Sequence, residues 1–429
     1  MIYTEKQRDI PVSGSFDVIV AGSGPAGMAA SVLAARGGAR VLLIEAQGSV
    51  GGIATTGLMS HFTGTADSAI YREFLHRAAN KNPYNKGEFT NKIDPELLKN
   101  TFYEMIKEEH IELLLYTFCC DAIVENNCVC GVITESKSGR QVFFAKVIID
   151  CTGDGDVAYY AGAEFFKGRE EDGLMQPATV MFKVGGVDYS KAVFPGSFET
   201  TVYTEKGELQ SLAKEILPHP AGHVLLYKST LPGIVTCNMT NCTGIDGTSA
   251  DDLTKAELVC RSQMEPIVDF LRKYVPGYEN CYIISAASLI GVRETRHFKG
   301  IKQLNEKDII EAKQFDDAVV RGAHFNFDVH NISGSGLDKT GVQKEFKQQK
   351  GYTIPYGCMV PEKIDGLLLS GRNISGTHMA HSNFRAMPIC AAIGEACGAA
   401  AAIAVKTGKE LRDIDPKEIQ KVVFHEDAV

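Results

Sequence analysis

Residues 17–45 constrain the fold of this chain more than any other segment. An apolar run at 18–21 predicts a buried parallel strand, and a glycine-rich turn and an alanine-rich helix at 28–35 follow it. A second apolar run at 41–44 predicts another strand, which ends in Glu45. Strand, helix and strand in this order predict a βαβ unit, the beginning of a parallel sheet with right-handed crossovers.

The turn between the first strand and the helix has the pattern of a dinucleotide site. It reads Gly22-Ser23-Gly24-Pro25-Ala26-Gly27. The first glycine permits the tight turn, the second lets the backbone approach a pyrophosphate, and the third lets the helix pack against its strand. The free N–H groups at the helix N-terminus then face the phosphate charge. Glu45 lies 18 residues after Gly27, near the ~20-residue offset at which an acid accepts a ribose hydroxyl.

Bulk properties narrow the class of protein. At 429 residues the chain predicts two or three domains, and its net charge of −9 argues against a general affinity for nucleic acid. Twelve cysteines favour a reducing, cytoplasmic setting over a disulfide framework. The N-terminus lacks the apolar core of a signal peptide, and Glu395 interrupts the alanine-rich stretch at 391–405. We therefore expect a cytoplasmic protein with no membrane span.

The order of patterns along the chain predicts an α/β fold in which a Rossmann-like domain is discontinuous. Residues 1–162 form its first part, with a meander of strands after the βαβ unit. Residues 163–350 alternate strand-like pieces with longer helices and predict an inserted α+β substrate domain. A parallel-type strand returns at 367–369, before a Gly/Ala-rich helix at 388–406. Residues 351–429 thus complete the nucleotide-binding domain.

Three further segments are candidates for cofactor contact. One is the glycine pair with its neighbours, Gly51, Gly52, Ile53 and Ala54, which follows Glu45 and is otherwise a simple turn. Another is Thr152 with Gly153 at the end of a buried strand, otherwise a polar β-turn. The last is the loop at 371–388, which precedes a helix N-terminus and contains Gly371, Arg372, His378, His381, Arg385 and Pro388. Its charged residues are either solvated or catalytic.

Together these segments resemble the bacterial FAD-dependent oxidoreductases of the glutathione-reductase-like superfamily. The matching stretches run from residue 17 to 398, and the Arg-x-Met-Pro sequence at 385–388 is the most specific of them. The resemblance implies FAD held by Gly22, Gly24, Gly27 and Glu45. It also implies a flavin near Gly52 and the C-terminal loop, and an inserted substrate domain.

Flavin chemistry predicts hydride transfer between flavin N5 and a small polar substrate, with an external electron acceptor or donor. His378, His381 and His61 are candidates for the base that moves a substrate proton. Arg385 and Arg293 are candidates for binding an anionic group or developing charge. The resemblance favours a flavin-facing position for Arg293 or Arg296.

Alternatives remain at this point. The chain shows no second dinucleotide motif, and Cys237 and Cys242 lie too late in the sequence for a flavin-linked dithiol. Asp328 and His330 lack a third metal ligand at recognisable spacing, so we expect no metal. A flavin-dependent monooxygenase or halogenase, and a non-catalytic flavin electron-transfer subunit, are the alternative functions. A homo-oligomer is compatible with each.

Overall fold

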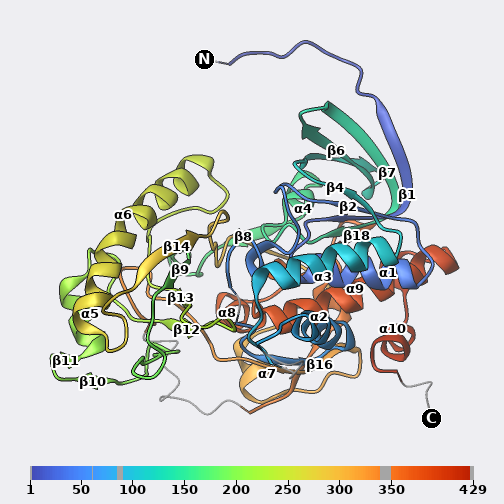
Figure 1. The fold of residues 1–429 in the computed structure, drawn as a ribbon. Helices are drawn as coiled ribbons and strands as arrows, with labels where there is room; N and C mark the ends of the chain where they lie inside the picture. Colours follow the sequence, from blue (N-terminus) through green and yellow to red (C-terminus); the bar gives the residue numbers. More distant parts are fainter. Residues whose placement is uncertain (1, 60, 85–89, 339–348, 426–429) are drawn as a thin grey trace.

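The computed structural model describes residues 2–59, 61–84, 90–338 and 349–425. Its centre is a seven-stranded sheet in the order β4-β2-β1-β7-β6-β5, with β18 paired to the second half of β7 (Figure 1). The parallel strands are β1 (Val12–Ala21), β2 (Val41–Ile44), β4 (Glu112–Leu114), β7 (Gly139–Asp150) and β18 (Leu367–Leu369). The antiparallel meander adds β5 (Phe118–Glu125) and β6 (Cys128–Ser136).

Three strand ends meet at one edge of this sheet. Ala21 and Leu369 both pair with Asp150, so the turns after β1, β7 and β18 lie side by side. The predicted βαβ unit is present, and the returning strand joins the same sheet. This edge is where a parallel α/β sheet binds its ligand.

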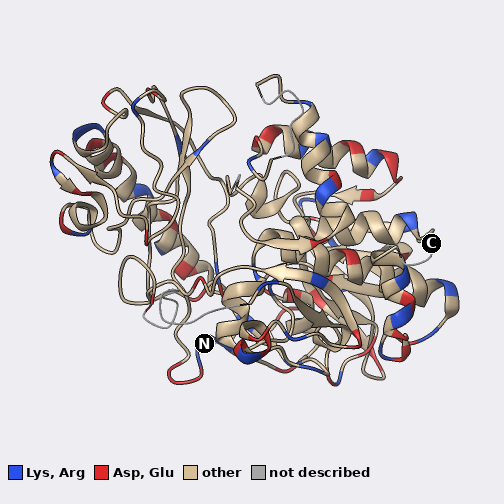
Figure 2. Cartoon of the chain, turned by 90° about the horizontal axis from the view of Figure 1, so that it is seen from below, with Lys and Arg blue, Asp and Glu red and all other residues tan. Residues whose placement is uncertain are grey.

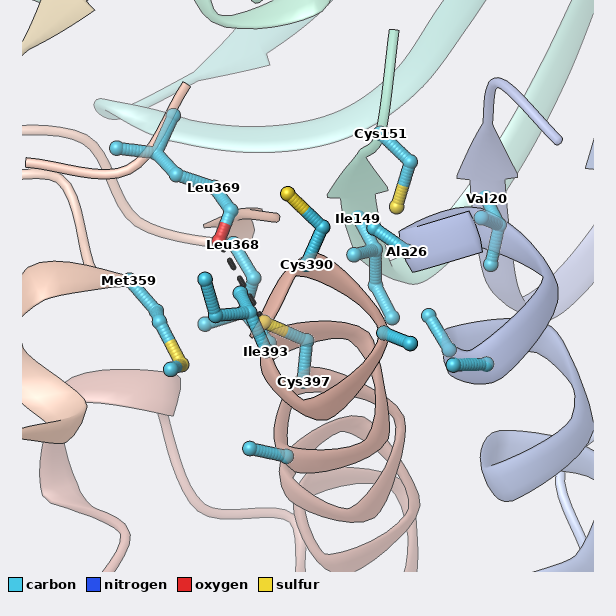
Figure 3. Packing of buried hydrophobic residues seen from close by; sticks show 14 of the residues in the cluster. Val20, Ala26, Ile149, Cys151, Met359, Leu368, Leu369, Cys390, Ile393 and Cys397 are labelled. Atoms are coloured by element: carbon cyan, nitrogen blue, oxygen red, sulfur yellow. Dashed lines mark hydrogen bonds between the residues drawn. The ribbon is translucent and has the colours of Figure 1, made fainter. Parts of the chain in front are cut away.

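Helices α1 (Pro25–Arg36), α3 (Pro95–Glu108) and α9 (Met387–Thr407) cover one face of the sheet (Figure 1). The closest helix contact depends on two glycines of α9. A Cβ at Gly394 would lie 2.1 Å from the Ala26 carbonyl oxygen, and one at Gly398 would lie 2.4 Å from that of Ala30. In Figure 3 the same helix packs beneath β18, and the Cys397 thiol reaches the Leu369 carbonyl oxygen at 3.4 Å.

Helix α9 corrects one expectation. By length and composition it could cross a membrane, although the alanine-rich stretch was expected to be too short and interrupted. Nearly nine-tenths of its apolar window is buried inside the protein, and Glu395 is itself buried. The helix is therefore apolar because it is the core helix of the domain.

A third layer lies on the far side of these helices. It contains β3 (Thr65–Asp67), β16 (Ala318–His324) and β17 (Tyr352–Pro355) in one antiparallel sheet. Helices α2 (Ala69–Asn80), α7 (Glu306–Ile310) and α10 (Pro416–Val423) flank this layer (Figure 1).

A second unit has its own hydrophobic core. Its sheet runs β12-β13-β9-β14 and is wholly antiparallel, with strands β9 (Phe182–Gly185), β12 (Leu226–Lys228), β13 (Val235–Cys237) and β14 (Tyr282–Ala286). Helices α5 (Leu209–Ile216) and α6 (Ala250–Tyr274) belong to this unit, together with the hairpin of β10 (Tyr203–Thr204) and β11 (Gly207–Glu208). This core draws on residues 178–287, whereas buried apolar residues between 298 and 327 belong to the first core. The domain bounds 163–350 stay a prediction.

Short elements join the two units. Strands β8 (Phe165–Lys167) and β15 (Arg296–Phe298) pair with each other, and helices α4 (Asp156–Tyr160) and α8 (His378–Phe384) lie nearby in the first unit. Over the outer helices and loops, Lys and Arg are mixed with Asp and Glu rather than separated by sign (Figure 2). Such a mixture gives little electrostatic attraction for nucleic acid.

Candidate functional site

The three glycines of the turn after β1 differ in their surroundings. Gly22 has a φ of +94°, and a Cβ there would lie 2.4 Å from the Cys151 carbonyl oxygen. A Cβ at Gly27 would lie 1.8 Å from the Gly22 carbonyl oxygen. A Cβ at Gly24 would meet nothing within 4 Å. Two glycines are therefore required by packing, whereas the middle one faces open space at the N-terminus of α1, where a pyrophosphate fits.

Glu45 is buried at the end of β2 and faces the same turn. One carboxylate oxygen accepts hydrogen bonds from the Ser23 N–H at 2.8 Å and the Ser23 hydroxyl at 2.5 Å. The other accepts from the Gln47 N–H at 2.8 Å. Three of the roughly four acceptor sites of the carboxylate are thus occupied, and the oxygen that accepts from Gln47 can accept one further hydrogen bond, as from a ribose hydroxyl.

The second glycine pair lies against the first turn. Gly51 and Gly52 have φ values of +103° and +52°, and Gly52 begins a short 3-10 helix, η1 (Gly52–Ala54). The Gly51 N–H donates to the Ser23 carbonyl at 2.9 Å, and a Cβ at Gly52 would lie 3.1 Å from the Gly24 Cα. The turns that the sequence assigns to the two halves of one cofactor are thus in contact.

The turns after β7 and β18 complete this edge. Gly153 lies beneath the Arg372 guanidinium, which forms an ion pair with Asp154 at 2.6 Å. Thr152 organises its own loop, since its hydroxyl donates to Asp150 at 2.7 Å and accepts from the Asp156 N–H at 2.9 Å. Burial raises the pKa of Asp150 to about 6.

On the β18 side, Gly371 packs against Ala26, and a Cβ there would lie 3.2 Å from the Ala26 Cβ. Pro388 lies in the first turn of α9. Cofactor contact by Thr152, Gly153, Gly371, Arg372 and Pro388 stays a prediction.

A cavity of about 330 Å³ adjoins these turns, between the two hydrophobic cores. The nucleotide-binding side contributes Ile53, Arg372 and Met387. The second unit contributes Thr179, Met181, Leu225, Tyr227 and Asn238, and the connecting segments contribute Arg293, Phe327, Asp328, His330 and Arg385. Its mixture of apolar walls and a few polar groups is typical of a small-molecule site.

Arg385 and Asp328 form a half-buried ion pair on the cavity wall. The Arg385 Nη2 donates to the Asp328 carboxylate at 2.9 Å and to its backbone carbonyl at 2.7 Å. Burial alone would raise the pKa of Asp328, but the hydrogen bond from His330 and the charges of Arg385 and Arg293 outweigh it and hold the pKa below its ordinary value. The charge of Arg385 is therefore already balanced.

His330 stays neutral beside this pair. Its Nε2 lies 3.3 Å from the Asp328 carboxylate, and burial together with the nearby Arg293 lowers its pKa to about 4. Its Nδ1 forms no hydrogen bond with the described part of the chain. That nitrogen can accept a proton from a bound molecule.

Arg293 lines the cavity without a carboxylate partner. Among the described residues its hydrogen bond goes from Nη1 to the Pro177 carbonyl, and it forms no ion pair. Burial and the charge of Arg385 lower its pKa to about 10, so it remains protonated near neutral pH. Arg296 points elsewhere, to Asp156 and the Tyr159 ring.

The second part of the predicted loop at 371–388, residues 378–388, is helical over most of its length. Thr377 caps α8, because its hydroxyl accepts from the Ala380 N–H at 3.2 Å. His378 and His381 do not line the cavity, whereas Arg385 does. Their candidate role as base stays a prediction, but in this structure both belong to a separate buried cluster.

Glu294 is the centre of that cluster. Its carboxylate Oε1 lies 2.6 Å from the His378 Nδ1 and 2.7 Å from the His297 Nε2, and its Oε2 accepts from the Gln176 N–H at 3.0 Å. Burial alone would raise its pKa, but the hydrogen bonds from the two histidines outweigh it and hold the pKa below the ordinary value.

The ring of His381 packs edge-on against His297, and burial lowers its pKa well below 6.5. In this cluster the Glu294 carboxylate is hydrogen-bonded to the imidazoles of His297 and His378, and the His381 ring packs beside them.

Three of these side chains, Glu294, His297 and His378, are close enough to hold a metal ion. The hydrogen bonding argues for a different arrangement. If His297 bound a metal through Nε2, its Nδ1 would carry the proton, and that buried atom has no partner among the described residues. A metal-bound histidine normally donates from its other nitrogen. Donation from Nε2 to Glu294 leaves only an acceptor unpaired, which favours hydrogen bonding over a metal.

His61 lies behind the cavity wall. Its ring centroid is 4.7 Å from that of Tyr227, which does line the cavity. Burial and the charge of Lys92 lower the pKa of His61 to about 4. His61 is thus in contact with a residue that lines the cavity and is not itself a lining residue.

Sequence reasoning missed Tyr227, Asn238, Thr179 and Gln176. These residues come from separate segments of the second unit and the adjoining chain, and no spacing pattern connects them. Asp328 and His330 were noticed for their spacing, which was considered mainly as metal-ligand spacing. Cys237 and Cys242 are both buried and free. They pair with Phe182 and Ala178, which places them ~13 Å apart along an extended strand, too far for a disulfide.

The family of this chain follows from a match along nearly its whole length. The sequence profile described as FAD dependent oxidoreductase matches residues 17–423. The chain belongs to the FAD-dependent oxidoreductase family. Its cofactor is FAD, and the glycine turns and Glu45 fit the ADP half of that molecule. No curated protein matches the chain in sequence.

Solved structures share the fold at low sequence identity. The flavin-dependent brominase Bmp2 is 11% identical and has a TM-score of 0.50, and the alignment covers 94% of this chain and 82% of that one. A geranylgeranyl bacteriochlorophyll reductase-like protein from Thermoplasma acidophilum is 14% identical with a TM-score of 0.49, over 95% and 82% of the two chains. The p-nitrophenol 4-monooxygenase PnpA from Pseudomonas putida is 11% identical with a TM-score of 0.49, over 95% and 84%. The brominase, at a TM-score of 0.50, has the same fold, and an identity this low leaves the reaction open.

Proposed function

We propose that this protein transfers a hydride between a small polar organic substrate in the 330 Å³ cavity and the flavin of FAD, with an external electron acceptor or donor. The observation that supports this most directly is the position of the cavity. Ile53 and Met387 line it beside the turns that fit FAD, and polar groups of the second unit line the opposite wall. Bound FAD would supply a hydride acceptor or donor at N5.

The chain's own residues would bind and orient the substrate. Tyr227 and Asn238, joined at 3.5 Å, offer hydroxyl and amide groups, and Met59, Met181 and Leu225 provide apolar walls that exclude water. His330 is the histidine of the cavity that can take a substrate proton at Nδ1, with Asp328 holding its other nitrogen. Arg385 would keep Asp328 ionised and in place.

Anaerobic mixing of the FAD-loaded protein with a panel of metabolites tests the proposal. A substrate should bleach the visible absorbance of the oxidised flavin in the absence of oxygen. His330→Gln should slow that reduction, whereas the exposed His76→Gln, a matched control, should not. Loss of one proton acceptor corresponds to a rate lower by roughly 10²- to 10⁴-fold.

The alternative is a flavin-dependent monooxygenase or halogenase. The brominase and the monooxygenase among the similar structures motivate this alternative. Their sequence identity to this chain is too low to transfer their reactions to it. Incorporation of labelled oxygen or halide into a product, with no anaerobic flavin reduction by the substrate, would favour this alternative. We also propose that the chain belongs to the glutathione-reductase-like superfamily, because of its Arg-x-Met-Pro sequence at 385–388, where α9 begins.

A further inference from the structure

Two of the three arginines that line the described part of the cavity form ion pairs. Arg385 is paired with Asp328 at 2.9 Å, and Arg372 with Asp154 at 2.6 Å. Arg293 forms no ion pair with any described residue, although it is only 8% exposed. A buried guanidinium has five N–H donors, and Pro177 occupies one of them.

Leaving such a group without a partner is costly. Burying a charge without an opposite charge or full hydrogen bonding is strongly unfavourable, so proteins satisfy nearly all buried guanidinium donors. The Nε and Nη2 atoms of Arg293 form no hydrogen bond with a described residue, yet neither is a fully buried atom without a partner. Both are therefore accessible from the cavity that Arg293 lines. Space beside an accessible guanidinium is the setting in which a carboxylate binds through two parallel hydrogen bonds.

The other charged groups of the cavity do not replace this ligand. Asp328 is committed to Arg385 and His330. Glu199 lines the cavity from a partly exposed segment of the second unit and forms no ion pair with Arg293. The neutral lining from Tyr227 and Asn238 adds hydrogen-bonding groups. Asp328 attracts Arg293 from beyond ion-pair distance, and its carboxylate forms its ion pair with Arg385 instead.

We propose that Arg293 is the carboxylate-binding residue of this cavity, and that the substrate class is therefore small organic carboxylates. This inference rests on the proposed function only in that the bound carboxylate is the substrate. Binding of a carboxylate at Arg293 needs no turnover. The choice of Arg293 over Arg385 is specific, because among the described residues Arg385 forms an ion pair and Arg293 does not. Arg385 would instead position Asp328.

A matched pair of probes tests the charge requirement. Calorimetric titration of the FAD-loaded protein with butyrate and with butyramide compares two molecules of similar size that differ in charge. We expect butyrate to bind at least ~10-fold more tightly, the lower limit for one charge-assisted interaction. Arg293→Met should reduce this preference to less than ~3-fold with unchanged FAD content, and Arg261→Met, on the exposed side of α6, should leave it intact.

Each other outcome overturns the inference. Equal binding of the two probes by the unaltered protein does so without any variant, and so does a preserved preference in Arg293→Met. If Arg293→Met does not fold, Arg293→Lys keeps the charge but loses the planar fork, and an undiminished preference in it counts against two-point binding. A lower flavin reduction potential in Arg293→Met with an unchanged butyrate preference would assign Arg293 to the flavin instead. Failure of every metabolite to reduce the flavin would contradict the proposed function alone, because the titration is independent of turnover.

Discussion

Gly24 and Gly27 should separate cofactor binding from folding, although they lie three residues apart in one turn. Gly24 has φ −61° and ψ −178°, which alanine adopts without strain, and its added Cβ would meet nothing within 4 Å. We therefore expect Gly24→Ala to change the free energy of unfolding of the FAD-free protein by no more than about 0.5 kcal/mol. At Gly27 the added Cβ would lie 1.8 Å from the Gly22 carbonyl oxygen, so α1 must move away from β1. Overpacking of this kind costs about 1–3 kcal/mol.

Gly24→Ala should weaken FAD binding although it leaves the stability nearly unchanged. The methyl group of Gly24→Ala occupies the space in which the pyrophosphate approaches the N–H groups of α1. Loss of one charge-assisted hydrogen bond, about 1.5–3 kcal/mol, corresponds to roughly 10- to 150-fold weaker binding of FAD.

Two measurements on the FAD-free protein check this pair. Urea unfolding followed by far-ultraviolet circular dichroism gives stability, and quenching of FAD fluorescence on titration gives affinity. The reasoning is refuted if Gly24→Ala binds FAD as tightly as the unaltered protein, or if it loses as much stability as Gly27→Ala.

The remaining predictions concern titration, thiols and the buried cluster. Burial lowers the pKa of His61 to about 4, of His223 to about 3 and of His330 to about 4, so between about pH 6.5 and 4 the unfolded chain binds more protons than the folded one. The free energy of unfolding should therefore fall as the pH is lowered through this window, by up to about 1.4 kcal/mol per pH unit for each histidine, and His223→Gln should reduce the slope in urea unfolding at several pH values. Replacing both Cys237 and Cys242 by Ala should leave the rate of flavin reduction nearly unchanged in stopped-flow measurements, since the two thiols are free and distant; loss of turnover in a folded, FAD-loaded variant would contradict this. Glu294→Gln should lower the stability of the protein by about 1–3 kcal/mol, because the amide nitrogen that replaces Oε2 cannot accept the hydrogen bond from the Gln176 N–H, and thermal unfolding measures the loss. Treatment with EDTA should change neither that stability nor flavin reduction, whereas a metal-dependent loss would show that the cluster holds an ion after all.

Local pattern predicted the nucleotide-binding elements closely. Strand β2 coincides with the predicted 41–44, and α1 and α9 extend the predicted helices by only a few residues. These elements were predictable because strand, turn and helix are adjacent in sequence, and each glycine has a steric role within that unit. The loop at 378–388 was less predictable, since Thr377 caps a short helix in a segment with weak periodicity.

The sequence by itself determined the FAD turn, the βαβ unit and the acid at Glu45, since hydrogen bonds and sterics within some thirty residues set all of these. Only the tertiary structure decided which charged residues face one another. It brings Arg293 and Arg385 to one cavity from positions 92 residues apart, places His378 and His381 in a cluster with Glu294, and leaves His61 behind Tyr227. The physical reason is that burial and pairing of a charge depend on which elements pack together. Spacing along the chain does not contain that information once the residues lie on separate elements.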